Sequence, residues 1–130
     1  MMDLDKFKAA NDRFGHTMGD ELLKQVVTRI TLCLRDSDMV ARLGGDEFVM
    51  VLENLKIPDD ADVIALKVIS TLTEAFQLSE SIRVQIGASI GISIYPKHGD
   101  NIESLMDHAD IALYQAKDNG RGCFAYFSKI

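Results

Sequence analysis

The stretch Arg42-Leu43-Gly44-Gly45-Asp46-Glu47-Phe48 joins two β-prone runs, at 39–43 and 48–52. Because glycine adopts the positive φ angles of a tight turn, the pattern predicts a β-hairpin with Gly44 and Gly45 at the turn. Two acids, Asp46 and Glu47, follow the glycines and lead into the apolar second strand, where their like charges repel each other. A divalent cation, or a substrate that carries one, would relieve this repulsion. The hairpin is therefore a candidate site for metal-assisted chemistry.

The composition is that of one globular domain. The chain has 130 residues, of which 47% are hydrophobic, and this is enough to bury a core. A formal net charge of −6 argues against nucleic acid as a partner, but not against nucleotides held through metal and a few local cations. Cys33 and Cys123 lack metal-ligand spacing; we expect small, buried, reduced side chains, although the pattern leaves a disulfide open.

Apolar periodicity predicts alternating strands and helices along the whole chain. The expected elements are a strand stub at 1–4, helices at 6–14 and 17–35, the two hairpin strands, a helix that opens at 58–60, a strand at 84–95, a helix from 100 to 120 and a strand at 123–127. The strand at 84–95 is the clearest, because its even-numbered positions are all apolar. We expect Asp5, Thr17 with Asp20, and Asp100 with Glu103 to cap helices.

The resulting order, β-α-β-β-α-β-α-β, predicts one α+β domain over residues 1–130 with a ferredoxin-like antiparallel sheet and flanking helices. In that topology the first and third strands are antiparallel neighbours, so Asp3 lies beside Asp46 and Glu47. Mg²⁺ takes one or two such carboxylates as ligands and completes its coordination with substrate phosphates and water. We therefore expect Asp3, Asp46 and Glu47 to bind metal and Asp5 to serve only as a cap.

Three motifs together resemble the GGDEF family, the diguanylate cyclases, and they cover essentially the whole chain. The motifs are Gly44-Gly45-Asp46-Glu47-Phe48, the opening segment Asp3-Leu4-Asp5-x-Phe7-Lys8-x-x-Asn11-Asp12-x-x-Gly15-His16-x-x-Gly19-Asp20, and the closing run Ala112-Leu113-Tyr114-Gln115-Ala116-Lys117-Asp118-Asn119-Gly120-Arg121. The chain departs from the family at Gly122, where Asn is common, and this departure puts the local loop geometry in doubt. The resemblance implies a nucleotidyl-cyclase-like fold.

The resemblance assigns the metal ligands and the catalytic residues. The metal, Mg²⁺ or Mn²⁺, would be held by Asp3, by the backbone carbonyl of Leu4, by Asp46 and by Glu47. Asp46 and Glu47 would be catalytic, and Glu47 would also activate the 3′-hydroxyl of the substrate.

The resemblance also assigns a set of nucleotide-binding residues: Lys8, Asn11, Asp20, Gly44, Gly45, Lys117 and Arg121. Asn11 and Asp20 would hydrogen-bond the guanine edge, whereas the three cations would contact phosphate. Simpler explanations stand beside these roles. Asp20 is a plausible capping residue, and Lys117 and Arg121 would favour the dipole at the end of a helix.

Arg35-x-x-Asp38 lies five residues ahead of Gly44, an offset that matches the family's inhibitory site for its product. As a bare pattern it indicates only an arginine at a helix end beside a solvated aspartate. The offset favours the product site.

The resemblance implies a diguanylate cyclase that condenses two GTP into cyclic di-GMP, with two GTP sites facing each other in a homodimer. It also leads us to expect a domain that is incomplete at its N-terminus, a fused upstream sensor, a possible EAL domain downstream, and a cytoplasmic location with a parent protein that can be membrane-anchored. Two alternatives remain open: a non-catalytic GTP or cyclic di-GMP receptor that regulates a fused phosphodiesterase, and another branch of palm-type nucleotide enzymes.

Overall fold

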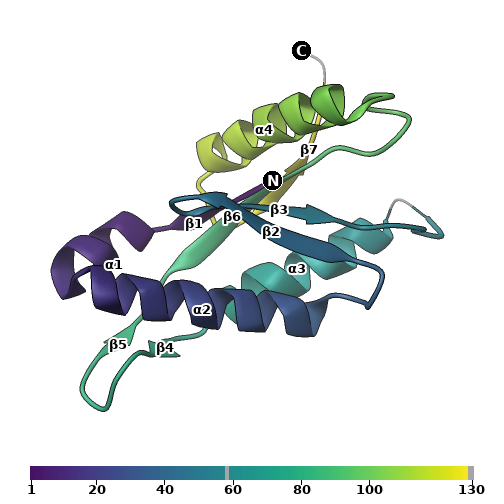
Figure 1. Ribbon diagram of the computed structural model, residues 1–130. Coiled ribbons are helices and arrows are strands. Elements are labelled where there is room, and N and C mark those ends of the chain that lie inside the picture. Colours follow the sequence, from purple (N-terminus) through teal and green to yellow (C-terminus); the bar gives the residue numbers. More distant parts are fainter. Residues whose placement is uncertain (58, 129–130) are drawn as a thin grey trace.

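A five-stranded sheet in the order β2-β3-β1-β6-β7 organises the protein, whose computed structural model describes residues 1–57 and 59–128 (Figure 1). The elements in chain order are β1 (Met2–Asp5), α1 (Phe7–Phe14), α2 (His16–Cys33), β2 (Met39–Gly44), β3 (Glu47–Val51), α3 (Asp60–Thr73), β4 (Phe76–Gln77), β5 (Arg83–Val84), β6 (Gly87–Ile92), α4 (Ile102–Asp118) and β7 (Phe124–Tyr126). Helices α2 and α3 cover one face of the sheet and α4 covers the other. The expected α+β fold is confirmed.

Strand β1 lies between β3 and β6 and is antiparallel to both. This central position is what the ferredoxin-like topology predicts for the first strand. Among the described strands the one parallel pair is β6 with β7, because α4 connects these two strands as a crossover helix. The sheet is therefore mixed at this edge, whereas the sequence pattern predicted an antiparallel sheet throughout.

The strand predicted at 84–95 is divided in two. Val84 belongs to β5, which pairs with β4 as a small separate hairpin, and β6 begins at Gly87. The apolar alternation runs through the break because both pieces bury their even-numbered side chains in one core: Val84, Ile86, Ala88 and Ile90 are all at most 7% exposed. A regular burial pattern therefore does not reveal a change of pairing partner.

The core lies between the sheet and helices α2 and α3. Leu22, Val26 and Ile30 of α2 are fully buried, as the i, i+4 spacing predicted, whereas Val27 is 38% exposed. On the other face, α4 packs closely on β6 at Gly91, where a Cβ atom would overlap the backbone of Ala109 and Leu113. Glycine at this position is thus a requirement of helix–sheet packing.

The helix starts differ from the predicted caps. Only Gly15 separates the end of α1 at Phe14 from the start of α2 at His16. Gly15 has a positive φ of 89°, which lets the chain change direction between the two helices. Thr17 and Asp20 therefore lie inside the helix and form no capping box. Helix α4 is capped by Asn101, whose side chain accepts a hydrogen bond of 2.8 Å from the Ser104 N–H, and Asp100 does not serve as the cap.

Position 58, where the third predicted helix was to open, lies outside the described residues, and that helix is described from Asp60. Cys33 and Cys123 are half-buried free thiols. None of the helices in the described part of the chain is long and apolar enough to cross a membrane.

We predict that Gly91→Ala destabilises the protein by about 1–3 kcal/mol or more, because an extra methyl in a packed interface forces the backbone to move. Gly87→Ala is the matched control on the same strand, since its Cβ would make only ordinary contacts, at 3.4 Å or more, with Asp5. Urea denaturation of both variants measures the difference. Equal stability of the two variants would contradict the packing at Gly91.

Candidate active site

Two carboxylates meet at the centre of the sheet because of the register between β1 and β3. Asp3 is paired directly with Glu47, and the Leu4 N–H donates a 3.1 Å hydrogen bond to the carbonyl oxygen of Asp46. Side chains of directly paired residues lie on the same face of a sheet, with Cβ atoms roughly 5 Å apart. The predicted proximity of Asp3 to Glu47 is therefore confirmed, and Asp46 lies beside β1 through its backbone carbonyl.

The hairpin turn is shifted by one residue from the prediction. Gly44 pairs with Glu47, so the two turn residues are Gly45 and Asp46, and Asp46 lies within the turn rather than after it. Gly45 has a φ of 53°, which a residue with a side chain rarely adopts. The Arg42 Nε donates a 2.9 Å hydrogen bond to the Gly45 carbonyl and closes the turn.

Asp3 has one oxygen engaged and one free. Oδ2 accepts a hydrogen bond from Lys117 Nζ, whereas the buried Oδ1 has no hydrogen-bond partner among the described residues. An unpaired buried oxygen costs free energy, so it indicates a missing partner. Within residues 1–57 and 59–128, no group of three or more His, Cys, Asp or Glu side chains is placed to hold a metal ion, so Asp3, Asp46 and Glu47 are not assembled as the predicted set of three acids.

These observations fit a Mg²⁺ or Mn²⁺ site that a nucleotide would complete. Such ions need only one or two protein carboxylates when substrate phosphates and water supply the other ligands. Asp3, with its free oxygen, and Glu47, exposed and directly opposite, provide those carboxylates. The residues present therefore fit the predicted metal.

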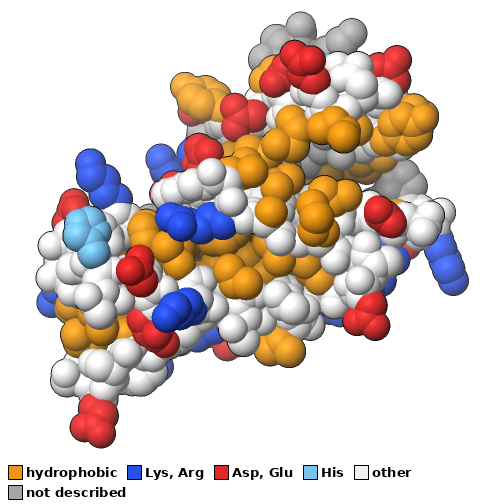
Figure 2. Space-filling model, in the orientation of Figure 1, with side chains coloured by type: hydrophobic (Ala, Val, Ile, Leu, Met, Phe, Trp, Pro, Cys, Tyr) orange, Lys and Arg blue, Asp and Glu red, His pale blue; other side chains and the backbone are white. Residues whose placement is uncertain are grey.

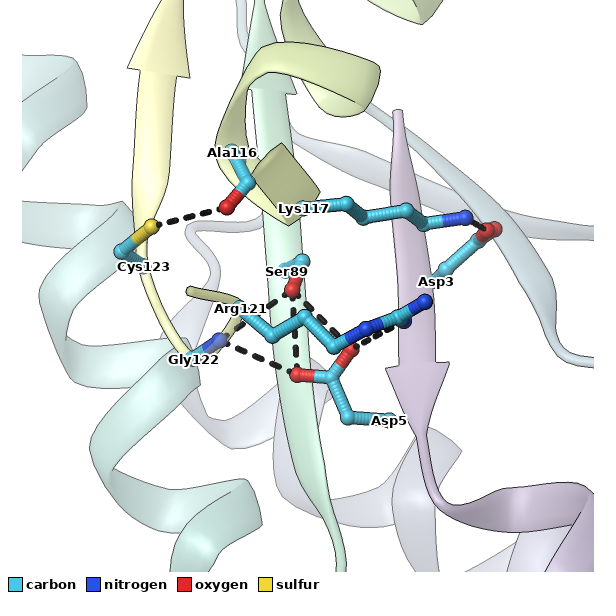
Figure 3. A network of polar contacts seen from close by, with 8 residues as sticks. All are labelled: Asp3, Asp5, Ser89, Ala116, Lys117, Arg121, Gly122 and Cys123. Atoms are coloured by element: carbon cyan, nitrogen blue, oxygen red, sulfur yellow. Dashed lines mark hydrogen bonds and ion pairs between the residues drawn. The ribbon is translucent and has the colours of Figure 1, made fainter. Parts of the chain in front are cut away.

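Two of the three predicted phosphate-binding cations, Lys117 and Arg121, come from the end of α4 and the loop after it (Figure 3). Lys117 forms an ion pair with Asp3, and Arg121 approaches Asp5 with 3.4 Å between Nη1 and Oδ1. Both cations thus lie over β1, next to the candidate metal ligands. The proximity of Lys117 to Asp3 could not be read from the sequence, because the two residues are 114 positions apart.

Asp5 does not cap α1, and this prediction was wrong. Lys6 occupies the cap position, and Asp5 is the last residue of β1, only 5% exposed. Its carboxylate accepts hydrogen bonds from the Ser89 hydroxyl and from the Gly122 N–H. The signal in the sequence was the spacing of Asp3 and Asp5, because residues two apart lie on the same face of a strand.

The predicted guanine-binding residues lie where α1 meets α2. The Asn11 amide nitrogen is 3.3 Å from His16 Nδ1, and the Asn11 side chain fills the space that a side chain at Gly19 would need. Asp20 follows Gly19 and is exposed, as is Lys8 on α1. Asn11 and Asp20 therefore belong to the same corner of the protein, and their role in binding stays a prediction.

Arg35 and Asp38 form an ion pair away from the hairpin turn. The Arg35 guanidinium donates hydrogen bonds of 2.8 and 3.0 Å to the two carboxylate oxygens of Asp38, and a further bond of 2.6 Å to the Glu53 carbonyl. The hydrogen bonds from Arg35 lower the pKa of Asp38. Strand β2 separates the pair from the Gly45 turn, as predicted from the sequence.

A separate hollow lies away from Asp3 and Glu47. A cleft of about 660 Å³ is lined mainly by apolar residues of β3, α3, β6 and α4, and neither Asp3 nor Glu47 belongs to its lining. Figure 2 shows an apolar surface over β2 and β3, where Met39, Leu43 and Val51 are 42–52% exposed. The lining of the cleft is mostly apolar, with polar side chains at Glu53, Asn54 and Ser93.

The structure defines an α+β domain with an acid pair, Asp3 and Glu47, on neighbouring strands, and comparison with known proteins specifies its family. Residues 1–123 match the family described as "Diguanylate cyclase, GGDEF domain". The chain belongs to the GGDEF family.

Relatives of known name include both cyclases and phosphodiesterases. The chain is 47% identical, over 97% of its length, to the bifunctional diguanylate cyclase/cyclic di-GMP phosphodiesterase MucR of Pseudomonas aeruginosa, of which it covers 18%. It is 38% identical, over 98% of its length, to the cyclic di-GMP phosphodiesterase PdeR of Escherichia coli, of which it covers 19%. The crystal structure of the GGDEF domain of TpbB from P. aeruginosa is similar with a TM-score of 0.95 and 41% identity, over 99% of this chain and 80% of that one. The chain thus spans less than a fifth of the length of MucR and of PdeR.

We predict that Mn²⁺ binds at the acid pair and depends on Asp3. Added to the protein, Mn²⁺ should broaden the amide NMR signals of Leu4, Asp46 and Glu47 through its unpaired electrons. The Asp3→Asn variant should need a Mn²⁺ concentration at least about tenfold higher for the same broadening, because the neutral amide is a far weaker ligand than a carboxylate. Asp107→Asn, an exposed acid on α4, serves as the control. Broadening that is the same in all three proteins would refute the metal assignment.

Proposed function

We propose that the chain is the catalytic domain of a diguanylate cyclase, which condenses two GTP molecules into cyclic di-GMP and releases two pyrophosphates. The observation that carries this proposal is the pairing of Asp3 with Glu47, with one oxygen of Asp3 left free. Membership of the GGDEF family and relatives named as diguanylate cyclases support it. Phosphoryl transfer of this kind relies on positioning and charge neutralisation more than on covalent chemistry.

Each part of the site has a task in this reaction. Mg²⁺ or Mn²⁺, when bound by Asp3, the Leu4 carbonyl, Asp46 and Glu47, would neutralise phosphate charge and acidify the attacking hydroxyl. Glu47 is exposed and can accept the proton of the 3′-hydroxyl. Lys117 and Arg121 lie over β1 and would bind phosphate oxygens.

Base selection would come from the corner between α1 and α2. Guanine offers O6 as an acceptor and N1–H and N2–H as donors, so an amide donor at Asn11 and a carboxylate acceptor at Asp20 complement it. Adenine would leave these groups unpaired. Lys8 on the same helix as Asn11 would add a phosphate contact, and Gly44 and Gly45 would let the nucleotide approach the hairpin backbone.

The working form would be a homodimer, because each protomer binds one GTP and cyclic di-GMP joins two. Since GTP is a cytoplasmic substrate, the domain would work in the cytoplasm. A fused sensor upstream and an EAL domain downstream would fit relatives of which the chain covers only a small part.

The second candidate function is a non-catalytic receptor that binds GTP or cyclic di-GMP and regulates a fused phosphodiesterase. It is favoured by the similarity to PdeR, which is named for phosphodiesterase activity. A palm-type polymerase is disfavoured by the net charge of −6.

We predict that the protein converts GTP to cyclic di-GMP in the presence of Mg²⁺, and that Glu47→Gln lowers the rate by at least about a hundredfold, within the usual range for general base catalysis. Because Glu47 is exposed, its loss should leave the melting temperature nearly unchanged. Chromatography of the nucleotides after incubation measures the product. ATP serves as the control substrate and should yield no cyclic dinucleotide.

Two results would separate the alternatives. Wild-type protein that binds GTP tightly without product would favour the receptor function. Turnover by Glu47→Gln near the wild-type rate would remove Glu47 from the catalytic site.

We further propose that Arg35 and Asp38 bind the product and hold the protomers apart. A guanidinium binds guanine O6 and N7 or phosphate through two hydrogen bonds, and a carboxylate accepts from N1–H and N2–H. Product binding there would exchange the Arg35–Asp38 ion pair for contacts with the ligand.

Arg35→Ala should relieve inhibition by cyclic di-GMP, with the inhibitory concentration raised about tenfold or more, as expected for the loss of a hydrogen bond to a charged group. The initial rate should stay the same, because β2 separates the pair from the acid cluster. Rate measurements at increasing cyclic di-GMP test this, with the exposed Arg83→Ala as the control. Unchanged inhibition, or direct competition between GTP and cyclic di-GMP, would exclude this site.

A further inference from the structure

Asp5 is a buried acid beside the candidate active site that the proposed function does not use. It lies two residues after Asp3 on β1, so both side chains lie on the same face of the strand, beneath the end of α4 (Figure 3). The two acids nevertheless have opposite surroundings. Asp3 has a free oxygen, whereas both oxygens of Asp5 have protein donors.

The donors to Asp5 come from β6 and from the loop after α4. The Ser89 hydroxyl lies 3.0 Å from each carboxylate oxygen, the Gly122 N–H donates at 3.1 Å to Oδ2, and Arg121 Nη1 lies 3.4 Å from Oδ1. A buried carboxylate that is surrounded by protein donors is poorly placed to bind a metal. Its bonds instead join three segments of the chain.

The loop that Asp5 contacts has an unfavourable backbone. Gly120, Arg121 and Gly122 have consecutive φ angles of 111°, 63° and 63°. The left-handed region is costly for a residue with a side chain, so Arg121 keeps this conformation only if its surroundings enforce it. The bond from the Gly122 N–H to Asp5 and that from the Arg121 N–H to the Ala116 carbonyl, at 3.1 Å, do so. The family commonly has Asn at position 122, and Asn also adopts left-handed φ angles. Gly122 is therefore compatible with the same loop conformation.

We propose that Asp5 is a positioning residue: it fixes the 119–123 loop on β1 and β6 and thereby places Arg121 for binding the phosphates of the nucleotide. The inference rests on the proposed function, because it takes the bound phosphate to be that of GTP. The Arg121 side chain is 57% exposed, and Asp5 is its one ion-pair partner among the described residues, at a long 3.4 Å. Most of the guanidinium is therefore available to a phosphate.

The direction in which Asp5→Asn changes the affinity for GTP distinguishes a positioning role from electrostatic repulsion alone. Asp5→Asn removes a negative charge close to where a triphosphate would bind, so Coulomb repulsion alone predicts tighter GTP binding. Positioning predicts weaker binding, because Gly122 and Arg121 contact different carboxylate oxygens and the amide replaces one of these oxygens with an NH2 group, which cannot accept. A purely structural role would lower the melting temperature without any effect that depends on phosphate.

The experiment measures, with Mg²⁺ present, the affinity of the protein for GTP, supplied as 3′-deoxy-GTP so that no turnover occurs, and for guanosine, which lacks phosphate. The proteins are wild type, Asp5→Asn, Arg121→Ala, the double variant, and Asp107→Asn as an exposed control. We expect Asp5→Asn to weaken the binding of GTP about tenfold or more, which is the effect of losing one hydrogen bond to a charged group. The affinity for guanosine should stay unchanged. The double variant should be little weaker than Arg121→Ala, because Asp5 acts through Arg121.

Amide hydrogen exchange at Gly122 provides a readout that needs no nucleotide. We expect exchange to be slow in wild type and in Asp107→Asn, and faster in Asp5→Asn. Tighter or unchanged GTP binding by Asp5→Asn, equal losses for GTP and guanosine, additive effects in the double variant, or unchanged exchange at Gly122 would each overturn the proposal. Failure of wild type to bind GTP would instead overturn the proposed function, and with it the assignment of the phosphate.

Discussion

The candidate site depends on the register in which β1 lies between β3 and β6. A shift by one residue would turn every β1 side chain to the opposite face, so that Asp3 and Asp5 would enter the core that Met2 and Leu4 now occupy. Met2 is fully buried and Leu4 is 2% exposed, which makes such a shift very costly. The apolar residues of this strand thus fix the position of its acids, and the pairing of Asp3 with Glu47 follows.

The same alternation explains how a buried strand can hold two carboxylates. Each acid has a cation from the far end of the chain: Lys117 for Asp3 and Arg121 for Asp5. Removing either cation would leave a buried carboxylate without its ion-pair partner. This destabilises a protein more than replacing both members of the pair with apolar residues. Helix α4 is held close enough for these contacts because Gly91 gives its backbone room on β6. The close packing of α4 on β6 therefore also sets the positions of Lys117 and Arg121 beside the two acids.

Much of the fold and the outline of the site could be predicted from the sequence. The Gly44–Phe48 hairpin, the central first strand and the proximity of Asp3 to Glu47 all follow from periodicity and topology. The caps were less predictable, because an acid before a helix has two competing partners, the helix N-terminus and a distant donor. For Asp5 the distant donor is Gly122, 117 residues away, and no local pattern reveals it. The division of 84–95 was hidden because both parts bury the same set of positions.

The central claim is that Asp3 and Glu47 act as one metal-binding pair, and a double-mutant cycle tests it most directly. The affinity for Mn²⁺ together with GTP would be measured by electron paramagnetic resonance for wild type, Asp3→Asn, Glu47→Gln and the double variant. If both carboxylates contact one ion, the two losses should be non-additive, with a coupling on the order of 1 kcal/mol or more, as for residues that share a partner. Losses that add within about 0.3–0.5 kcal/mol, the usual result for independent sites, would contradict the claim.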